Sequence, residues 1–225
     1  LLPFVLNTNA FWDFANTNSD GTMSKRLSPQ MLLSYEFNLP PYSNQKPLAD
    51  KLWAAYSLKA SKLKLIDAID EMVKSQFIEM FGCKTPNVKV GDVSSVVSGK
   101  SISKDLEDIP GDIAYVKVAD FNLPENNKYI QVSSRYVTSE NANSSKLIPP
   151  GTIIFAKNGA ASMSNKKRLT AIECCIDMNT LAIIPNSQKV DSGFLYAIFD
   201  SLDLSFYVRQ GAVPSISPHA IEGIE

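Results

Sequence analysis

The chain has 225 residues, enough for one large domain or two small ones with a substantial buried core. It is 44% hydrophobic and 20% charged, which is typical of a folded protein and excludes a disordered tail. Its 22 Lys and Arg against 23 Asp and Glu give a formal net charge of −1. This balance excludes a globally basic, histone-like binder of nucleic acid but not a local basic surface. We expect neither a membrane span nor a signal peptide, because no apolar run approaches roughly 18–20 residues and no basic region precedes the first apolar one.

Cysteine and histidine are too few for most metal or nucleophile chemistry. Cys83, Cys174 and Cys175 are odd in number and two are adjacent, which fits neither a disulfide framework nor a zinc site. His219 follows Ser217-Pro218, so we expect an exposed histidine at the start of a helix and not the base of a Ser-His-Asp triad. The sequence therefore predicts no metal, no cofactor and no catalytic residue, and a reducing, cytoplasmic compartment.

The most regular pattern runs from Gln45 to Phe81, where apolar residues recur at steps of three and four. Pro47 lies near its start and Gly82 follows its end, as at the two ends of a helix. At ~1.5 Å per residue such a helix spans about 55 Å, more than the width of a small domain. Its broad apolar face favours antiparallel pairing with an equivalent helix, and the alternative is a core helix packed on its own domain. The expected pairing residues are Leu52, Leu58, Leu65, Ile69 and Met72.

Beyond Gly82 the sequence changes to short β-branched or aromatic runs separated by Gly, Pro, Asn and Ser. This spacing predicts a twisted, mostly antiparallel sheet. The expected strands are residues 88–90, 93–97, 113–118, 129–132, 153–156, 172–176 and 181–184. From Gly193 onward the apolar spacing is helical again. The predicted class of this region is therefore α+β.

The two ends of the chain resemble each other. Residues 2–14 have helical spacing, and a loop at residues 19–21 precedes a second short helix that Ser28 is expected to cap. The same order recurs roughly 190 residues later, where residues 2–8, Gly21 and residues 27–29 align with residues 195–201, Gly211 and residues 216–218. We therefore expect three regions. They are residues 1–39, the tail of a first repeat; residues 40–82, a linker and the long helix; and residues 83–225, the domain of the next repeat.

Two motifs suggest enzymes but lack the context that the chemistry needs. Residues 38–42 read Asn-Leu-Pro-Pro-Tyr, close to the Asn-Pro-Pro-Tyr of DNA amino-methyltransferases, but Leu39 interrupts the motif and no glycine-rich turn for a methyl donor accompanies it. Residues 99–101 read Gly-Lys-Ser, like the end of a phosphate-binding loop, but the required upstream glycine is replaced by Ser95. We interpret the first as a helix-entry linker and expect no nucleotide site at the second.

Three polar loops in residues 83–225 carry the residue types that contact DNA. Each combines Lys or Arg with amide and hydroxyl groups beside small residues, as phosphate contacts and readout of base edges require. A single loop of this kind is usually only solvated, but three on one small domain indicate a binding surface. The candidate DNA-binding residues are Lys100, Ser101 and Lys104; Lys157, Asn158, Lys166, Lys167 and Arg168; and Arg209, Gln210 and Ser215.

The order of motifs along the whole chain is similar to that of a known family. The motifs are residues 21–29; residues 39–41 with Gln45; residues 77–82; residues 90–93; residues 148–155; and residues 211–218. They resemble the specificity (S) subunit of type I restriction–modification systems. That family has two target-recognition domains joined by two long antiparallel helices, and this sequence lacks most of the first domain and the second helix.

The resemblance implies a non-catalytic, cytoplasmic subunit that recognises one half of a bipartite site in double-stranded DNA. The long helix would set the spacing between the half-sites. The implied partners are DNA methyltransferase (modification) subunits, a restriction subunit, and a second copy or second repeat that supplies the equivalent helix. Methyl donor, ATP and magnesium would belong to those partners. The alternative is a non-catalytic protein-interaction module whose long helix dimerises.

Overall fold

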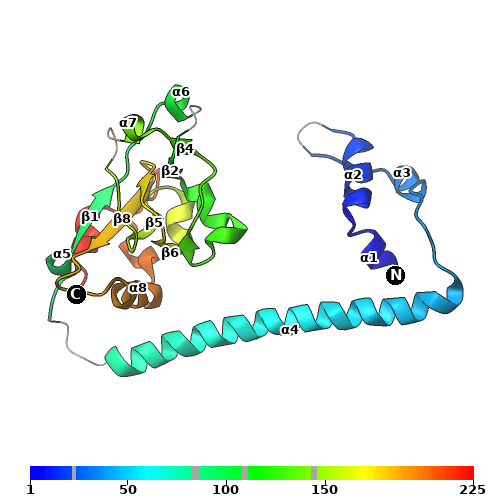
Figure 1. The fold of residues 1–225 in the computed structure, drawn as a ribbon, viewed down its shortest axis with the longest axis horizontal. Coiled ribbons are helices and arrows are strands. Elements are labelled where there is room, and N and C mark those ends of the chain that lie inside the picture. Colours follow the sequence, from blue (N-terminus) through cyan, green and yellow to red (C-terminus); the bar gives the residue numbers. More distant parts are fainter. Residues whose placement is uncertain (22–23, 83–86, 108–110, 143–145) are drawn as a thin grey trace. The chain divides into compact units, whose positions relative to one another are not determined.

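The computed structural model describes residues 1–21, 24–82, 87–107, 111–142 and 146–225 (Figure 1). The chain divides into two compact units, Leu1–Glu71 and Met72–Glu225. Cys83, one of the three cysteines considered above, lies outside the described residues. Within the described ranges, no helix has the length and hydrophobicity needed to cross a membrane.

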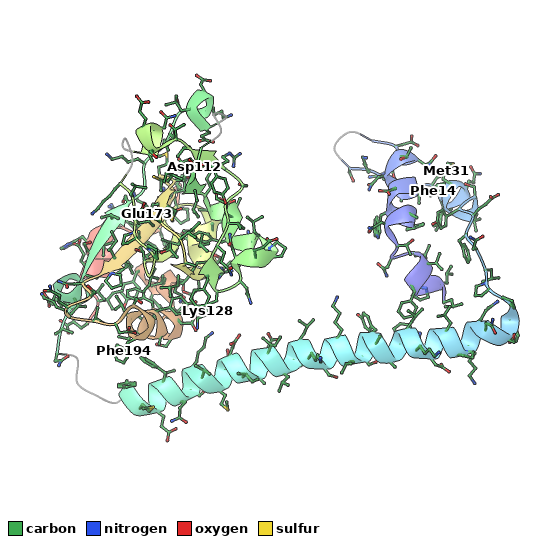
Figure 2. All side chains as sticks on the ribbon, viewed as in Figure 1. Phe14, Met31, Asp112, Lys128, Glu173 and Phe194 are labelled. Carbon is green, nitrogen blue, oxygen red and sulfur yellow. The ribbon has the colours of Figure 1, made fainter. Side chains whose placement is uncertain are left out.

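The first unit begins with three short helices, α1 (Leu2–Val5), α2 (Asn9–Thr17) and α3 (Pro29–Leu33). The helical spacing predicted over residues 2–14 is interrupted between α1 and α2, because the Thr8 side chain accepts a hydrogen bond from the Phe11 N–H and begins a new helix. Phe14 on α2 and Met31 on α3 extend into the space between these two helices (Figure 2). The Tyr35 ring packs against both Phe11 and Phe14 and completes this small aromatic cluster.

The predicted long helix is confirmed as α4 (Tyr42–Phe81). It begins before the predicted Gln45, so Pro47 lies inside the helix and not at its first turn. At the other end, the Gly82 N–H donates to the Ile78 carbonyl. None of its residues is buried. Its apolar side chains therefore lie largely in solvent in the single chain, in contrast to those of an ordinary core helix.

The second unit contains two sheets (Figure 1). The five-stranded sheet has the order β1 (Ser94–Ser98), β8 (Thr180–Pro185), β5 (Ile153–Ala156), β6 (Lys167–Thr170) and β3 (Tyr129–Ile130). The three-stranded sheet has the order β4 (Tyr136–Val137), β2 (Ile113–Val116) and β7 (Cys174–Ile176). Neighbouring strands are antiparallel except for β2 with β7 and β3 with β6. The predicted mostly antiparallel α+β fold is therefore confirmed.

Short helices complete the second unit. They are α5 (Val90–Val93), α6 (Lys104–Glu107), η1 (Val118–Asn122), η2 (Pro124–Asn126), α7 (Ser139–Ala142), η3 (Ala160–Ser164), α8 (Ser192–Ser201), η4 (Leu204–Tyr207) and α9 (Pro218–Glu222). The main core joins Leu195 and Phe199 of α8 and Ile221 of α9 to Phe155 and Leu181 of the sheet. A second cluster lies on alternate residues of the same strands and includes residues of β2 and β7. The five-stranded sheet is therefore buried on both sides.

Two predicted local structures are wrong. The strand expected at residues 88–90 is replaced by the start of α5, because the Asp92 carboxylate accepts from the Lys89 N–H at 2.9 Å and stabilises a turn there. The loop expected around Lys167 and Arg168 is strand β6, which pairs with β5 on one side and β3 on the other. Carbonyl groups elsewhere in the unit accept from both cationic side chains, so charge does not keep these residues out of the sheet.

The two ends of the chain share a local pattern of hydrogen bonds. An antiparallel bridge joins Asp20 to Arg26, and another joins Arg209 to Ser215. Each bridge is followed by a five-residue helix that begins with proline, α3 or α9, and the serine before each proline caps the helix with its side chain. Asp20 precedes Arg209 by the same number of residues as the capping Ser28 precedes the capping Ser217. Gly21 therefore corresponds to Gln210 and not to Gly211, a shift of one residue from the sequence alignment.

Candidate nucleic-acid interface

Three predicted loops meet at one end of the five-stranded sheet. Ser98 is the last residue of β1 and pairs with Leu181, while Ala156 is the last residue of β5 and pairs with Thr180. The chain leaving β1, the chain leaving β5 and the turn before β8 therefore emerge together. We call the segments at this end the loop cluster. They are residues 99–103, 157–159, 177–179 and 209–215.

The hairpin 209–215 is attached to the cluster by backbone groups. Arg209 and Ser215 exchange N–H···O bonds of 2.8 and 3.1 Å, which close the hairpin. The Gly159 N–H donates to the Pro214 carbonyl at 2.8 Å, and the Ile216 N–H donates to the Lys157 carbonyl at 2.9 Å. Because these bonds use no side chain at the tip, the exposed residues 210–213 are available for contacts outside the chain.

The loop after β1 depends on close backbone packing. A Cβ atom at Gly99 would lie 2.2 Å from the Asp177 carbonyl oxygen, so only glycine fits there. The Lys100 N–H donates to the Ile176 carbonyl at 3.1 Å, and buried Ile102 anchors the following turn. The side chains of Lys100 and Ser101 are exposed between these two anchors. Lys104 is also exposed, at the first residue of α6 just beyond this loop.

A polar network lies beneath the loops and was not found from the sequence. The Asp177 carboxylate accepts from the Asn179 backbone N–H at 3.2 Å and from its side-chain amide at 2.8 Å, while the Tyr115 hydroxyl lies 3.0 Å from its other oxygen. Asn179 in turn accepts from the Asn158 side chain at 3.2 Å and from the Lys157 N–H at 2.7 Å. Burial, and then the negative charge of Asp177, raise the pKa of Tyr115 far above its usual value, so this hydroxyl keeps its proton.

Three of the predicted DNA-binding residues make their hydrogen bonds outside the loop cluster. The exposed Lys166 ammonium donates to the Asn122 side chain, and Lys167 is only 4% exposed and donates to the Leu202 carbonyl at 2.7 Å. Arg168 donates through its guanidinium to carbonyl groups of Phe121, Asn126 and Lys167. The cationic groups of Lys167 and Arg168 donate to acceptors within the domain. These two side chains therefore stabilise the domain and do not lie on an open loop.

The loop cluster combines positive charge with amide groups on an almost neutral chain. The exposed cationic side chains are Lys100 and Arg209, with half-buried Lys157 between their loops and exposed Lys104 nearby. Lys157 also donates to Ser98 at 3.2 Å, which directs its ammonium toward the end of β1. Phosphates are contacted by such cations, and amides of the type present at Gln210 distinguish base edges in the major groove. The arrangement is suited to binding a polyanion with selectivity.

Side chains that could share a metal ion are not brought together in the described part of the chain. Within it, no group of three or more His, Cys, Asp or Glu residues could hold a metal ion. Burial raises the pKa of the Cys174 thiol to about 12, so this thiol is not ionised near neutral pH. His219 lies on α9 with its side chain 98% exposed, as predicted, and its nearest described charged partner is Glu222 on the same helix.

Comparison with known proteins decides the family. The family model for the type I restriction modification DNA specificity domain matches residues 84–225, which is more than half of the chain. The chain belongs to this family. The matched specificity domain is the region that contains the loop cluster.

Two solved structures share the fold of the chain. One comes from a study of complex assembly and conformational transition of the type I R-M system, with a TM-score of 0.54 and 16% sequence identity. The other is the HsdS subunit from Thermoanaerobacter tengcongensis, with a TM-score of 0.51 and 15% identity. Each match covers 94% of this chain, but only 55% and 54% of the other chains, so this specificity-domain chain spans about half their length. Among curated proteins, none matches the chain significantly.

Proposed function

We propose that the second unit recognises one half of a bipartite site in double-stranded DNA, as the specificity component of a type I restriction–modification system. The observation that carries the proposal is the convergence of Lys100, Lys157 and Arg209 with Asn158 and Gln210 at one end of the sheet. These groups provide phosphate contacts and base-edge contacts side by side. Family membership supports the same role.

The remaining regions have supporting roles in this proposal. Residues 83–225 form the target-recognition domain, and residues 1–39 form the tail of a preceding one. Within residues 40–82, α4 pairs antiparallel with an equivalent helix of a second copy or second repeat and sets the distance between half-sites. The exposed apolar side chains of α4 support the pairing.

Catalysis belongs to the partners in this proposal. Modification subunits would supply methyl transfer and a restriction subunit would supply cleavage, both in the cytoplasm, while this chain selects the sequence. The titratable side chains of the loop cluster are mainly cations, which are suited to holding a polyanion. This supports a role in DNA binding for this chain and leaves the catalytic steps to its partners. An interaction module without DNA binding is the alternative, and the experiment below separates the two.

The salt dependence of duplex binding tests the proposal. Replacing Lys100, Lys157 and Arg209 together by alanine should flatten the slope of log K against log salt by up to about three units, roughly 0.9 for each lost phosphate contact. The matched control replaces three exposed lysines outside the cluster, Lys89, Lys128 and Lys189, and should leave the slope almost unchanged.

Titrations over several salt concentrations with the full chain give both slopes. If the cluster and control variants have the same slope as the unmodified chain, the loop cluster is not the DNA-binding surface. If the unmodified chain binds no duplex, the interaction-module alternative is favoured.

A further inference from the structure

The polar network beneath the loop cluster connects the loops after β1 and β5 through buried and half-buried side chains, and backbone bonds extend the connection to the hairpin. We propose that Tyr115, Asp177 and Asn179 are positioning residues that fix these loops relative to one another and thereby set the sequence selectivity of DNA recognition. The proposal rests on the proposed function and extends it to residues that do not touch DNA themselves.

The first connection holds the loop after β1. The Tyr115 hydroxyl accepts from the Ile102 N–H at 3.2 Å, and it lies 3.1 Å from the Lys100 carbonyl and 3.0 Å from the Asp177 carboxylate, to one of which it donates. Tyr115 is fully buried in β2, a strand of the other sheet. The backbone that carries Lys100 and Ser101 is therefore fixed from below by one hydroxyl group.

The second connection holds the loop after β5 and, through it, the hairpin. Asp177 is 8% exposed and accepts two hydrogen bonds from Asn179, which fixes the orientation of that side chain. Asn179 then accepts from the Asn158 amide and the Lys157 N–H. Lys157 and the residue after Asn158 are in turn bonded to the hairpin backbone. A displacement of Asn179 would therefore reach both Asn158 and the hairpin.

Selectivity should be more sensitive to this network than general affinity. A bidentate contact to a base edge requires donors and acceptors at fixed distances, whereas a lysine contact to phosphate tolerates a shift of the loop. Charge-assisted bonds to a buried carboxylate are stronger than neutral ones, so Asp177 is suited to hold this geometry. Loss of one link should consequently reduce discrimination between sequences while the number of phosphate contacts stays the same.

Two substitutions, each with a matched control, test the inference in the full chain. Tyr115→Phe removes the linking hydroxyl, and Tyr136→Phe removes a hydroxyl from the adjacent strand β4, where it accepts only a 3.4 Å bond from the Ser133 N–H among the described contacts. Asn179→Ala removes the side chain, just before β8, that joins Asp177 to Asn158. Asn186→Ala removes a similar asparagine just after the other end of β8, where it accepts from the Gln188 N–H.

The probe is a pool of duplexes with randomised positions, followed by titration of the best selected duplex and of a scrambled one. For Tyr115→Phe and Asn179→Ala we expect the ratio of the two affinities to fall about tenfold, the usual effect of one mismatched base pair. The salt slope should not change, and both control variants should keep the ratio of the unmodified chain. Thermal unfolding of all five proteins shows which variants remain folded; if one network variant does not fold, the other decides.

The outcomes are distinct. An unchanged affinity ratio in a folded network variant overturns the inference, as does an equal loss of specific and scrambled binding. An equal fall of the ratio in the control variants also overturns it, because the effect would then be general destabilisation. If the unmodified chain selects no sequence from the pool, the proposed function itself fails.

Discussion

Replacing Leu65 and Ile69 by aspartate tests the proposed pairing of α4. In the single chain Leu58 is 58% exposed, Leu65 60%, Ile69 45% and Met72 64%. Complete burial of such a side chain contributes about 1.5–3 kcal/mol, so covering the exposed half contributes about 1 kcal/mol. Two paired copies cover eight of these side chains, which amounts to about 8 kcal/mol before ordering costs, comparable to micromolar affinity.

The double substitution removes two of these side chains from each copy and places charges in the interface. We expect a loss of at least about 4 kcal/mol, which weakens association roughly thousandfold. Sedimentation equilibrium of the unmodified and substituted chains, at concentrations from micromolar upward, measures the change. Circular dichroism should show that the second unit remains folded, because Leu65 and Ile69 belong to the first unit.

A control variant distinguishes a specific interface from a general effect of charge. Ala60→Asp with Lys64→Asp places two aspartates with the same spacing of four on the other side of the helix, since each residue turns the helix by about 100°. This variant should associate like the unmodified chain. Equal association of the unmodified and Leu65/Ile69 chains would refute the pairing. An unmodified chain that stays monomeric throughout the concentration range would exclude a second copy of this chain as the source of the partner helix.

Three further predictions follow from the second unit and its hairpin. Burial lowers the pKa of Lys167 from 10.5 to about 8, so between these pH values the unfolded state binds more protons than the folded state. In urea titrations, the unfolding free energy of the unmodified chain relative to that of Lys167→Met should therefore rise by on the order of 2 kcal/mol from pH 7 to pH 10. A difference that does not change with pH would contradict the buried-lysine argument. Gly99→Ala should lower the unfolding free energy by about 1–3 kcal/mol in the same assay, because the added Cβ meets the Asp177 backbone. Gly211→Ala should lower it far less, since the nearest described neighbour of its Cβ lies 4.0 Å away. Equal losses would refute the steric argument. Exchanging residues 210–214 for residues 21–25, of which 22–23 lie outside the described residues, should change the selected DNA sequence more than the overall affinity; a fall in affinity with the same selected sequence would make the hairpin a clamp and not a reader.

Elements defined by local signals could be predicted from the sequence. The apolar spacing of residues 45–81 is sufficient for a helix, and the expected strand at residues 153–156 is found unchanged as β5. The Ser-Pro pairs identify the starts of α3 and α9, because an N-cap serine and a proline at the first helical position act within one turn.

Features that depend on distant partners could not be predicted. Lys167 and Arg168 look like a charged loop in sequence, and only the carbonyls of Leu202 and Phe121, which are far away along the chain, show how a strand accommodates them. Tyr115 and Asp177 are separated by 62 residues, so no spacing rule relates them. Lys100, Ser101 and Gln210, which the sequence predicts as candidate contact residues, are exposed at the loop cluster, but the sequence missed the network beneath them.

The attachment of the 209–215 hairpin has a consequence for evolution. Because backbone N–H and carbonyl groups hold this hairpin in place, the exposed tip residues 210–213 contribute little to folding, and most substitutions there should leave stability almost unchanged. Mutations at the tip can then accumulate without unfolding the domain, while the buried Tyr115 and Asp177 remain constrained. Under the proposed function, new DNA specificities would arise one substitution at a time on a scaffold that does not have to change.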